Sequence, residues 1–165
     1  FLRNADVVKV ACLAQIANVI APILVEDRGV LVQSIYHPIA RIRQGAKGKS
    51  LVPLLISPAI PAGKLGECAA LDVSAIHDPD QETLNIYVVN RSGTKQNLEL
   101  KLRDLSATSW KAEALASENL DSRNTWDQPE TVKWAPMILG AEASEGIFKI
   151  PPHAFVALSA KVSAI

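Results

Sequence analysis

The sequence has no net charge, few cysteines and no long hydrophobic run. Its 165 residues include 17 Lys and Arg against 17 Asp and Glu, and no cluster of basic residues stands out. Binding to nucleic acid or to an acidic membrane surface is therefore disfavoured. The apolar run from Val19 to Val25 contains Pro22 and is much shorter than the roughly 20 residues that cross a bilayer. We expect no nucleic-acid partner and no membrane span.

Residues that typically hold metals or phosphates are also scarce. The two cysteines, Cys12 and Cys68, lie far apart in apolar stretches, where burial as free thiols is the usual outcome. The three histidines are scattered and lack the helical spacing of a zinc site. The glycines at 45 and 48 follow an expected helix and do not form a phosphate-binding loop. We expect no metal, no cofactor and no phosphoryl transfer.

The sequence does contain enough apolar residues, 48% of the total, to build a core. The pattern of apolar, polar and turn-forming residues changes near residue 48. In the first part, the β-branched residues over 7–10 fit either a helix face or a buried strand that leads to Gln15, and periodicity does not decide between them. An apolar loop over 18–27 and a helix over 34–46 follow. Strand, loop and helix would make one βα unit, which needs a larger α/β body to complete it.

After residue 48 the sequence consists of short apolar or alternating runs that Pro, Gly and Asp separate. Such punctuation is typical of a β-sandwich or jelly roll. The runs predict strands over 51–57, 71–77, 83–90, 98–105, 110–116, 147–150 and 155–162. The stretch 117–133 is polar and has no period. The sequence therefore predicts two units, with a βα unit over 1–47 and a β-sandwich over 48–165.

Gln15 interrupts the apolar stretch from Val7 to Leu24, in company with Asn18. A buried amide needs hydrogen-bond partners, so Gln15 either bonds the backbone of the following loop or reaches into a cavity. The residues alone favour the structural role. A residue at the end of a barrel strand, however, points toward the catalytic mouth of the barrel. Both interpretations stay open on the residues alone.

Several short motifs resemble one enzyme family. They are Arg3-Asn-Ala-Asp6, Ala11-Cys-Leu-Ala-Gln15, Asn18-Val-Ile-Ala-Pro-Ile23, Gln33-Ser-Ile-Tyr36 with Pro38, and Val88-Val-Asn-Arg91. Together they resemble the C-terminal portion of glycoside hydrolase family 51 α-L-arabinofuranosidases, most densely over 3–48. The resemblance implies a mainly β chain, in which the last βα unit of a (β/α)8 barrel precedes an antiparallel, jelly-roll-like β-sandwich. It also implies that a strand ends near Gln15.

The resemblance implies a retaining enzyme that removes terminal arabinofuranosyl residues from hemicellulose oligosaccharides, with Gln15 bonding the arabinose ring. Such an enzyme needs two carboxylates about 5 Å apart, and the Asn-Glu motif of the family does not occur in this sequence. We therefore expect no catalytic residue within 1–165 and no activity from this chain alone. The expected partners are an arabinose-containing oligosaccharide and the remainder of the barrel. The full-length protein is expected to be a homo-oligomer, in the cytoplasm because no signal-peptide layout is visible.

Two non-catalytic alternatives remain for this chain. A carbohydrate-binding β-sandwich would need exposed aromatic residues as a sugar platform, yet aromatic residues make up only 5% of the chain. At least two of the three tryptophans, Trp110, Trp126 and Trp134, are expected to pack in the core or to anchor loops instead. The other alternative is a module for oligomerisation and for bracing the barrel, which is also what 48–165 is expected to do within the enzyme.

Overall fold

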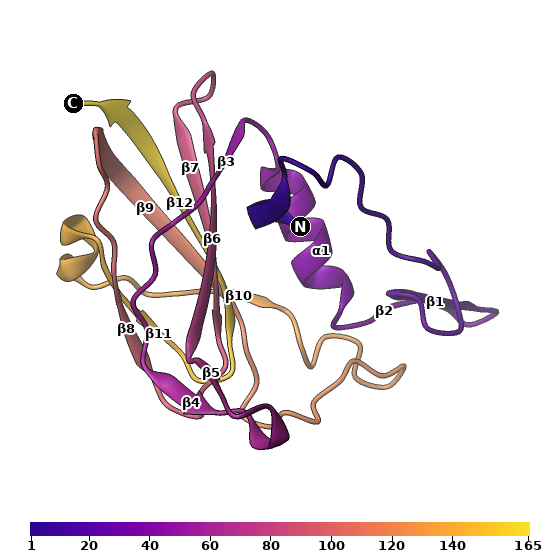
Figure 1. The fold of residues 1–165 in the computed structure, drawn as a ribbon. Coiled ribbons are helices and arrows are strands. Elements are labelled where there is room, and N and C mark those ends of the chain that lie inside the picture. The colour runs from indigo at the N-terminus through magenta and orange to yellow at the C-terminus, as the bar shows by residue number, and fades with distance from the viewer.

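The computed structural model describes residues 1–165, and most of its regular structure is an antiparallel β-sandwich (Figure 1). Six strands form the main sheet in the order β10-β9-β12-β7-β6-β3. These are β3 (Lys49–Leu51), β6 (Leu71–Asp78), β7 (Thr83–Asn90), β9 (Leu105–Leu115), β10 (Trp134–Pro136) and β12 (Phe155–Ala164). The smaller layer pairs β8 (Gln96–Glu99) with β11 (Ile147–Ile150). The mainly β, sandwich fold class is therefore confirmed.

Short elements complete the sandwich at its ends. A small hairpin joins β4 (Ala59–Pro61) to β5 (Glu67–Ala69) through the 3-10 helix η2 (Gly63–Leu65). A second 3-10 helix, η3 (Ala141–Glu145), leads into β11 and packs against it. No helix of the structure has the length and apolar character that a membrane crossing requires.

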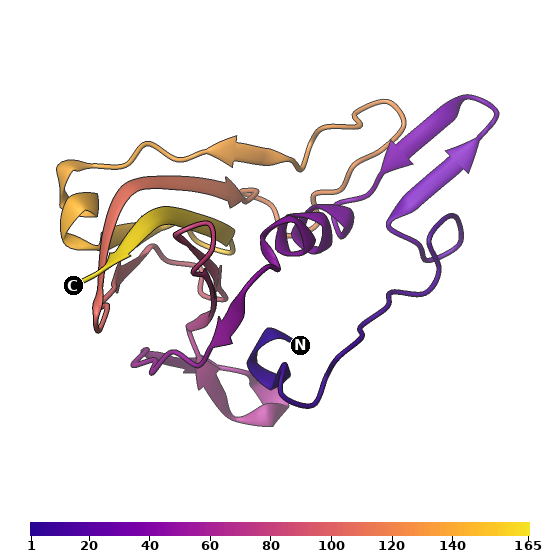
Figure 2. The same ribbon diagram turned by 90° about the horizontal axis from the view of Figure 1, so that it is seen from above.

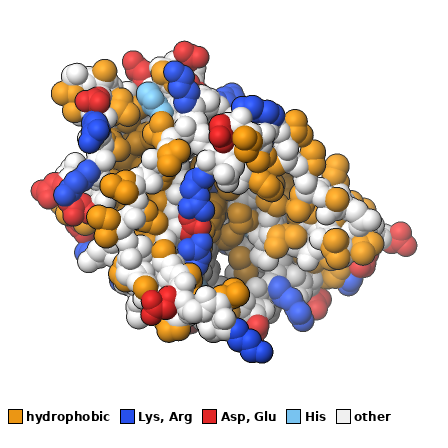
Figure 3. Space-filling model, in the orientation of Figure 1, with side chains coloured by type: hydrophobic (Ala, Val, Ile, Leu, Met, Phe, Trp, Pro, Cys, Tyr) orange, Lys and Arg blue, Asp and Glu red, His pale blue; other side chains and the backbone are white.

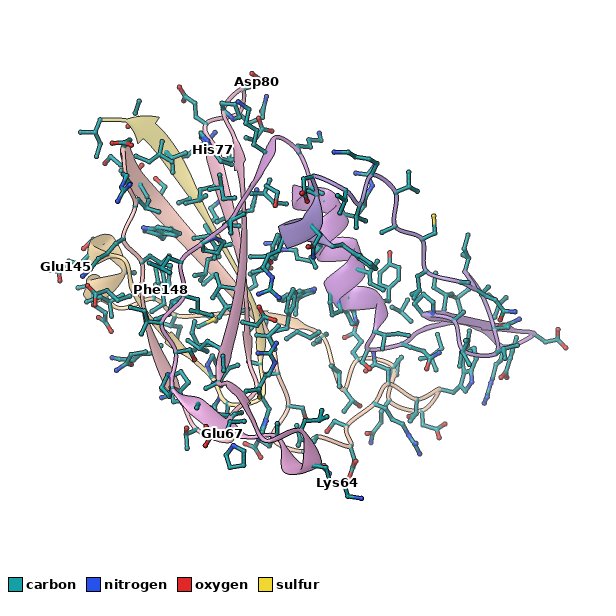
Figure 4. All side chains as sticks on the ribbon, viewed as in Figure 1. Lys64, Glu67, His77, Asp80, Glu145 and Phe148 are labelled. Carbon is teal, nitrogen blue, oxygen red and sulfur yellow. The ribbon has the colours of Figure 1, made fainter.

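One hydrophobic core fills the space between the two layers, because inward side chains alternate along each strand. On β7 the inward residues are Leu84, Ile86 and Val88, each 3% exposed or less. The smaller layer contributes Phe148, whose ring meets the ring of Trp110 edge-on at 4.9 Å between centroids. Phe148, labelled in Figure 4, is 1% exposed and belongs to the core between the layers. The alternation that predicted these strands is thus the alternation that builds the core.

The structure confirms the predicted strands over 71–77, 83–90, 147–150 and 155–162, and β9 contains most of 110–116. Two strand predictions are wrong. The run 98–105 is split, because β8 ends at Glu99 and the chain turns at Asp104, whose φ is 61°. The run 51–57 is a strand only at its first residue, since the prolines at 53 and 58 remove backbone donors and the chain continues without a ladder partner.

The first 47 residues hold one α-helix and little other regular structure. The helix α1 (Tyr36–Gly45) confirms the prediction over 34–46. The 3-10 helix η1 (Leu2–Asn4) lies near the start of the chain. The apolar loop expected over 18–27 is wrong in its second half, because β1 (Ile23–Glu26) pairs with β2 (Gly29–Val32) as a hairpin around the Asp27-Arg28 turn. Figures 1 and 2 show this hairpin projecting away from the sandwich.

The strand expected to end near Gln15 is absent from this structure, in which residues 8–13 carry no regular structure. A strand needs a hydrogen-bonded neighbour, and no other segment of the chain pairs with this one. The side chains of Val7 and Val10 are consequently exposed. Both cysteines are free thiols, but Cys12 is exposed and Cys68 only half-buried, so the expected burial of these thiols is wrong for this chain.

Helix α1 packs on the outer face of the main sheet, as the view from above shows (Figure 2). Its residue Ile42 joins a small apolar cluster that includes Tyr87 and Ala157. Gly45 makes this close packing possible, because a Cβ at that position would collide with the hydroxyl of Tyr87. Gly48 is needed for a second reason: its φ is 93°, and a Cβ there would collide with the carbonyl oxygen of His77. The chain thus passes from α1 to β3 through glycines that fit tightly against the sheet.

Candidate functional site

Gln15 lies between η1 and β1, and its side chain is exposed. The polar contacts of this loop run through Asn18 and Gln33, and Gln15 takes no part in them. The hydrogen bond to the loop backbone that the sequence favoured for Gln15 is therefore not present. An exposed amide without a partner in its own chain is free to bond a ligand or another polypeptide. Its role stays a prediction.

The loop that carries Gln15 is shaped by Asn18. This residue has a left-handed backbone, with φ of 63°, which asparagine tolerates better than most residues. Its Oδ1 accepts a hydrogen bond from the backbone N–H of Val25 at 2.7 Å, and its own N–H donates to the carbonyl of Ile23 at 2.8 Å. Asn18 therefore fixes the end of the loop to the first strand of the hairpin.

Gln33 holds the other side of the same loop. Its backbone N–H donates to the carbonyl of Pro22 at 2.9 Å, and its side-chain amide donates to the carbonyl of Ala21. Ala21 is fully buried, so the base of the loop is packed although its tip is exposed. Asn18 and Gln33 both belong to the motifs that carried the family resemblance. The structure gives both a role in positioning the loop.

The polar stretch 117–133 is fastened to the hairpin by Asn124, which is buried. Its side-chain amide donates to the carbonyls of Val32 at 2.9 Å and Val132 at 3.1 Å. Its Oδ1 accepts from the backbone N–H of Val132 at 2.7 Å. In addition, the guanidinium of Arg28 lies 4.3 Å from the ring centroid of Trp126. Sequence reasoning missed this anchor, because one asparagine in an aperiodic segment carries no pattern.

Large apolar side chains surround Gln15 and face solvent. Ile16, Val19 and Ile20 are 77%, 81% and 73% exposed, and Leu13 is 47% exposed. Figure 3 shows hydrophobic side chains gathered on the side of the molecule where the β1–β2 hairpin lies. A contiguous apolar surface of this kind usually marks a contact with another part of a protein. The loop therefore combines an unpaired amide with a surface suited to packing.

The sandwich holds the start of this segment through Asp72 on β6. The carboxylate of Asp72 accepts a hydrogen bond from the guanidinium of Arg3 at 2.7 Å and another from Arg91 at 2.5 Å. Arg91 also donates to the carbonyl of Ala69 at 3.1 Å. Nearby, the hydroxyl of Ser50 donates to the carbonyl of Leu2 at 2.5 Å. Three charged groups thus clamp η1 to the sheet.

Asn90, the other polar residue of the Val-Val-Asn-Arg motif, has a structural role. It is 1% exposed, and its amide donates to the carbonyls of Thr94 at 2.9 Å and Pro151 at 2.8 Å. Its Oδ1 accepts from the backbone N–H of Ser92 at 3.0 Å. Because every polar atom of this side chain is satisfied, Asn90 ties the end of β7 to the chain before β12.

A second ion pair links α1 to the sheet. The guanidinium of Arg41 pairs with the carboxylate of Glu113 on β9 and lies 5.9 Å from the ring centroid of Trp134. Beside it, the phenol of Tyr87 lies 3.5 Å from the carbonyl oxygen of Arg41. Burial raises the pKa of Tyr87, and the positive charge of Arg41 opposes part of that rise. The contact between helix and sheet is thus apolar at its centre and charged at its rim.

The tryptophans do not form a shared platform. Trp110 packs on Phe148, Trp134 packs on Phe155 at 5.6 Å between centroids, and Trp126 is covered by Arg28. All three are half-buried, which confirms the expected packing and anchoring roles. No group of three or more His, Cys, Asp and Glu side chains is arranged to hold a metal ion.

Comparisons of the sequence with known proteins agree on one family. The sequence pattern of the α-L-arabinofuranosidase C-terminal domain matches residues 1–154. An intracellular exo-α-(1→5)-L-arabinofuranosidase of Bacillus subtilis (strain 168) is 34% identical over 125 residues, which are 75% of this chain and 25% of that protein. An exo-α-(1→6)-L-arabinofuranosidase of Bifidobacterium longum is 32% identical over 167 residues, which are 97% of this chain and 32% of that protein.

A solved structure agrees with these sequences. A family 51 α-L-arabinofuranosidase from Bifidobacterium longum superposes with a TM-score of 0.85 at 26% identity, covering 96% of this chain and 31% of that one. The chain thus spans about a quarter to a third of the length of these relatives. On the family pattern, the sequence identity and the shared fold together, the chain belongs to the C-terminal domain family of glycoside hydrolase family 51 α-L-arabinofuranosidases.

Proposed function

We propose that this chain is the C-terminal part of a retaining α-L-arabinofuranosidase, which removes terminal arabinofuranosyl residues from oligosaccharides. The names of the relatives, which describe exo-acting arabinofuranosidases, support the reaction. They differ in linkage, (1→5) in one and (1→6) in the other, so the proposal concerns the arabinofuranosyl end and not its linkage. The two catalytic carboxylates come from polypeptide outside residues 1–165.

The observation that carries the proposal is the loop around Gln15. Its amide is exposed and unpaired, it is surrounded by exposed apolar side chains, and Asn18 holds its end in place. In the proposed enzyme, residues 7–15 form the last strand of a barrel, and the apolar side chains pack against the neighbouring strand and helices. The amide of Gln15 then reaches the pocket and hydrogen-bonds the arabinose ring.

The test is kinetics and thermal unfolding of the full-length polypeptide. If the amide bonds the sugar more strongly in the transition state, Gln15→Ala lowers kcat/KM by about 1–3 kcal/mol of transition-state binding. The melting temperature should change little, because Gln15 bonds nothing in its own chain. Leu13→Ala is the control, and its loss of about 2–5 kcal/mol of stability would mark a core position in the barrel. Normal kinetics with a sharply lowered melting temperature for Gln15→Ala would show that this residue has a structural role and does not bind the sugar.

A second assay tests where the catalytic groups lie. Residues 1–165 alone should not hydrolyse an aryl arabinofuranoside, while the full-length polypeptide should. Turnover by residues 1–165 that survives purification, and that persists in every Glu→Gln variant, would contradict the proposal. Turnover that one such variant abolishes would instead locate a catalytic carboxylate within this chain.

Bracing of the barrel is a second proposed function, and the Asp72 clamp favours it. Asp72 holds Arg3, and Glu113 holds Arg41, so the sandwich fastens both ends of the βα unit. We place the boundary of the two units at 47/48, since α1 ends at Gly45 and β3 begins at Lys49. Packing of the Trp residues gives no support to a sugar-binding platform. In the full-length enzyme, Asp72→Asn should lower thermal stability by about 1–2 kcal/mol without removing a substrate contact.

Two further properties complete the proposal. The relative from Bacillus subtilis is named an intracellular enzyme, and free thiols at Cys12 and Cys68 suit a reducing compartment, so we place the protein in the cytoplasm. Cell fractionation tests this placement. We also propose a homo-oligomer, as the family resemblance implies, and sedimentation of the full-length polypeptide at several concentrations tests it.

A further inference from the structure

A polar groove of about 450 Å³ lies between the end of helix α1 and the outer face of the main sheet. Its wall includes Gln44 and Gly45 from the last turn of α1, and its floor is formed by β7, β9 and β12. Only two of its 14 lining residues are hydrophobic, so its walls do not suit an apolar ligand. Its lining also includes Asp78 and Gln81, which flank the tip of the β6–β7 turn where Figure 4 labels Asp80.

The groove lies where the outer face of the main sheet changes from apolar to polar side chains along β7. Tyr87 is buried under α1, whereas Asn85 lies beside Gly45 at the end of the helix and Thr83 follows further along the same face of β7. On β12 the same change leads from the buried Ala157 to the half-buried Ser159. The helix thus covers the apolar part of this face and ends where the polar part begins.

Positive charge is concentrated in the groove although the chain as a whole is neutral. The basic side chains that line it are Arg41, Lys47, Lys111 and Lys161, against one carboxylate, Asp78. Arg41 is neutralised by Glu113, and Asp78 accepts the backbone N–H groups of its own turn at 3.1 Å. No lysine of the groove has an acidic partner within ion-pair distance; the ammonium of Lys161 bonds only the carbonyl of Gln81, at 2.9 Å.

The neutral polar groups of the groove are also unpaired. The amides of Gln44 and Asn85 and the hydroxyls of Thr83 and Ser159 make no side-chain hydrogen bond within the chain, although Asn85, Thr83 and Ser159 are half-buried. Amides and hydroxyls in a concave site match the donors and acceptors of sugar hydroxyls. Beside them, three ammonium groups without an acidic partner match a negative charge on the same ligand.

We propose that this groove binds an anionic sugar, that is, a saccharide that carries a carboxylate or a phosphate. The lysines pair with the anionic group, and the amides and hydroxyls bond the ring hydroxyls. The groove shares no residue with the loop that carries Gln15, so it is a second site that goes beyond the proposed hydrolysis. Its existence does not depend on the arabinofuranosidase assignment.

Isothermal titration of the full-length polypeptide tests the proposal. The probes are digalacturonic acid for the carboxylate, ribose 5-phosphate for the phosphate, and xylobiose as a neutral sugar. We expect one of the anions to bind, more weakly as salt is raised, and xylobiose to bind much less. Binding of digalacturonic acid would identify a uronate-bearing polysaccharide as the source, and binding of ribose 5-phosphate a metabolite. Equal binding of xylobiose, or binding of no probe at millimolar concentration, would overturn the proposal.

Variants locate the site. The double substitution Lys111→Gln with Lys161→Gln should weaken anion binding by about tenfold, and Lys111→Arg with Lys161→Arg should largely preserve it. Lys64→Gln is the matched control, since Figure 4 shows Lys64 at the opposite end of the sandwich from Asp80. Unchanged binding in the double glutamine variant would overturn the proposed location. Gln15→Ala should leave anion binding intact, so failure of this site and failure of the proposed hydrolysis are distinguishable.

Discussion

Large apolar side chains are mostly buried in the sandwich and mostly exposed in the first 47 residues. In the sandwich, Val88 and Val156 are fully buried and the layers close over them. In the first 47 residues, Ala21 and Leu31 are the only buried hydrophobic residues apart from proline, and more than half of the exposed large hydrophobic residues of the whole chain lie there. Similar residue types therefore give a closed core in one region and an open surface in the other. The difference is the presence of a partner layer, and not the local sequence.

Hydrogen exchange should give the largest contrast between the two regions. Amides in β7 should exchange only through global unfolding, which costs about 5–15 kcal/mol in a typical domain, while amides over 9–15, which have no backbone hydrogen bond, should exchange without protection. In the full-length polypeptide, where the proposed barrel covers this segment, residues 7–15 should become protected. Equal protection of both regions in monomeric residues 1–165 would contradict the expected difference in burial between them.

Truncation of a core side chain should have the next largest effect. Phe148 is 1% exposed and contacts Trp110, so Phe148→Ala should lower the free energy of unfolding of residues 1–165 by about 3–5 kcal/mol. Leu54 is 93% exposed, and Leu54→Ala should change stability by less than about 0.5 kcal/mol. Chemical denaturation measures both values. A small loss for Phe148→Ala would mean that the two layers of the sandwich are not closed on each other.

The junction between the two regions can be loosened at Gly45. A methyl group there would meet the hydroxyl of Tyr87, so Gly45→Ala should cost about 1–3 kcal/mol of stability and move α1 off the sheet. Arg43→Ala, in the same turn but at an exposed side chain that makes no hydrogen bond or ion pair, is the control. Thermal unfolding followed by circular dichroism reports the effect. An unchanged melting temperature for Gly45→Ala would show that the helix does not pack this closely.

The smallest effect is the pH dependence of the same junction. Because burial raises the pKa of Tyr87 above its ordinary value near 10, the folded state keeps the phenolic proton that the unfolded state releases. This contribution to stability is complete below pH 10 and is lost as the pH rises through the higher folded-state pKa. Tyr87→Phe should remove this alkaline loss.

At neutral pH, Tyr87→Phe should change stability by less than about 1 kcal/mol, since the hydroxyl lies at the limit of hydrogen bonding from Arg41. Unfolding measured from pH 8 to 11 separates the two effects. The exposed Tyr36→Phe serves as the control and should keep the alkaline loss. An alkaline loss of the same size in the Tyr87→Phe variant would show that another group causes it.

Sequence patterns predicted the parts of the fold that depend on alternation alone. The strands β7 and β12 follow from runs in which every second residue is apolar, and α1 follows from its helical spacing. The turn at Asp104 and the hairpin β1–β2 were missed, because they depend on single backbone conformations and on pairing between neighbours. The segment 7–15 shows a further limit, since its pattern suits a strand whose ladder partners this chain does not supply.

The candidate sites were predictable to different extents. Gln15 was found because one amide interrupts an apolar run and because the motif around it resembles a known family. Asn124 carried no signal, since its partners Val32 and Val132 are defined only after folding. The lysines of the groove come from separate elements, Lys111 from β9 and Lys161 from β12, and no sequence spacing relates them. A site whose residues come from several strands is recognised only once the fold is known.

The clamp on Asp72 has a consequence for the order in which the protein forms. Arg3 and Asp72 are 69 residues apart, and Asn124 and the carbonyl of Val32 are 92 apart. During synthesis the segment with Gln15 leaves the ribosome well before Asp72 and Asn124 have been made. It stays unfastened to the sandwich until β6, and then the 117–133 segment, have been made. Fixing this segment therefore depends on contacts of long sequence separation, which slow folding because their loops must close before the contacts can form.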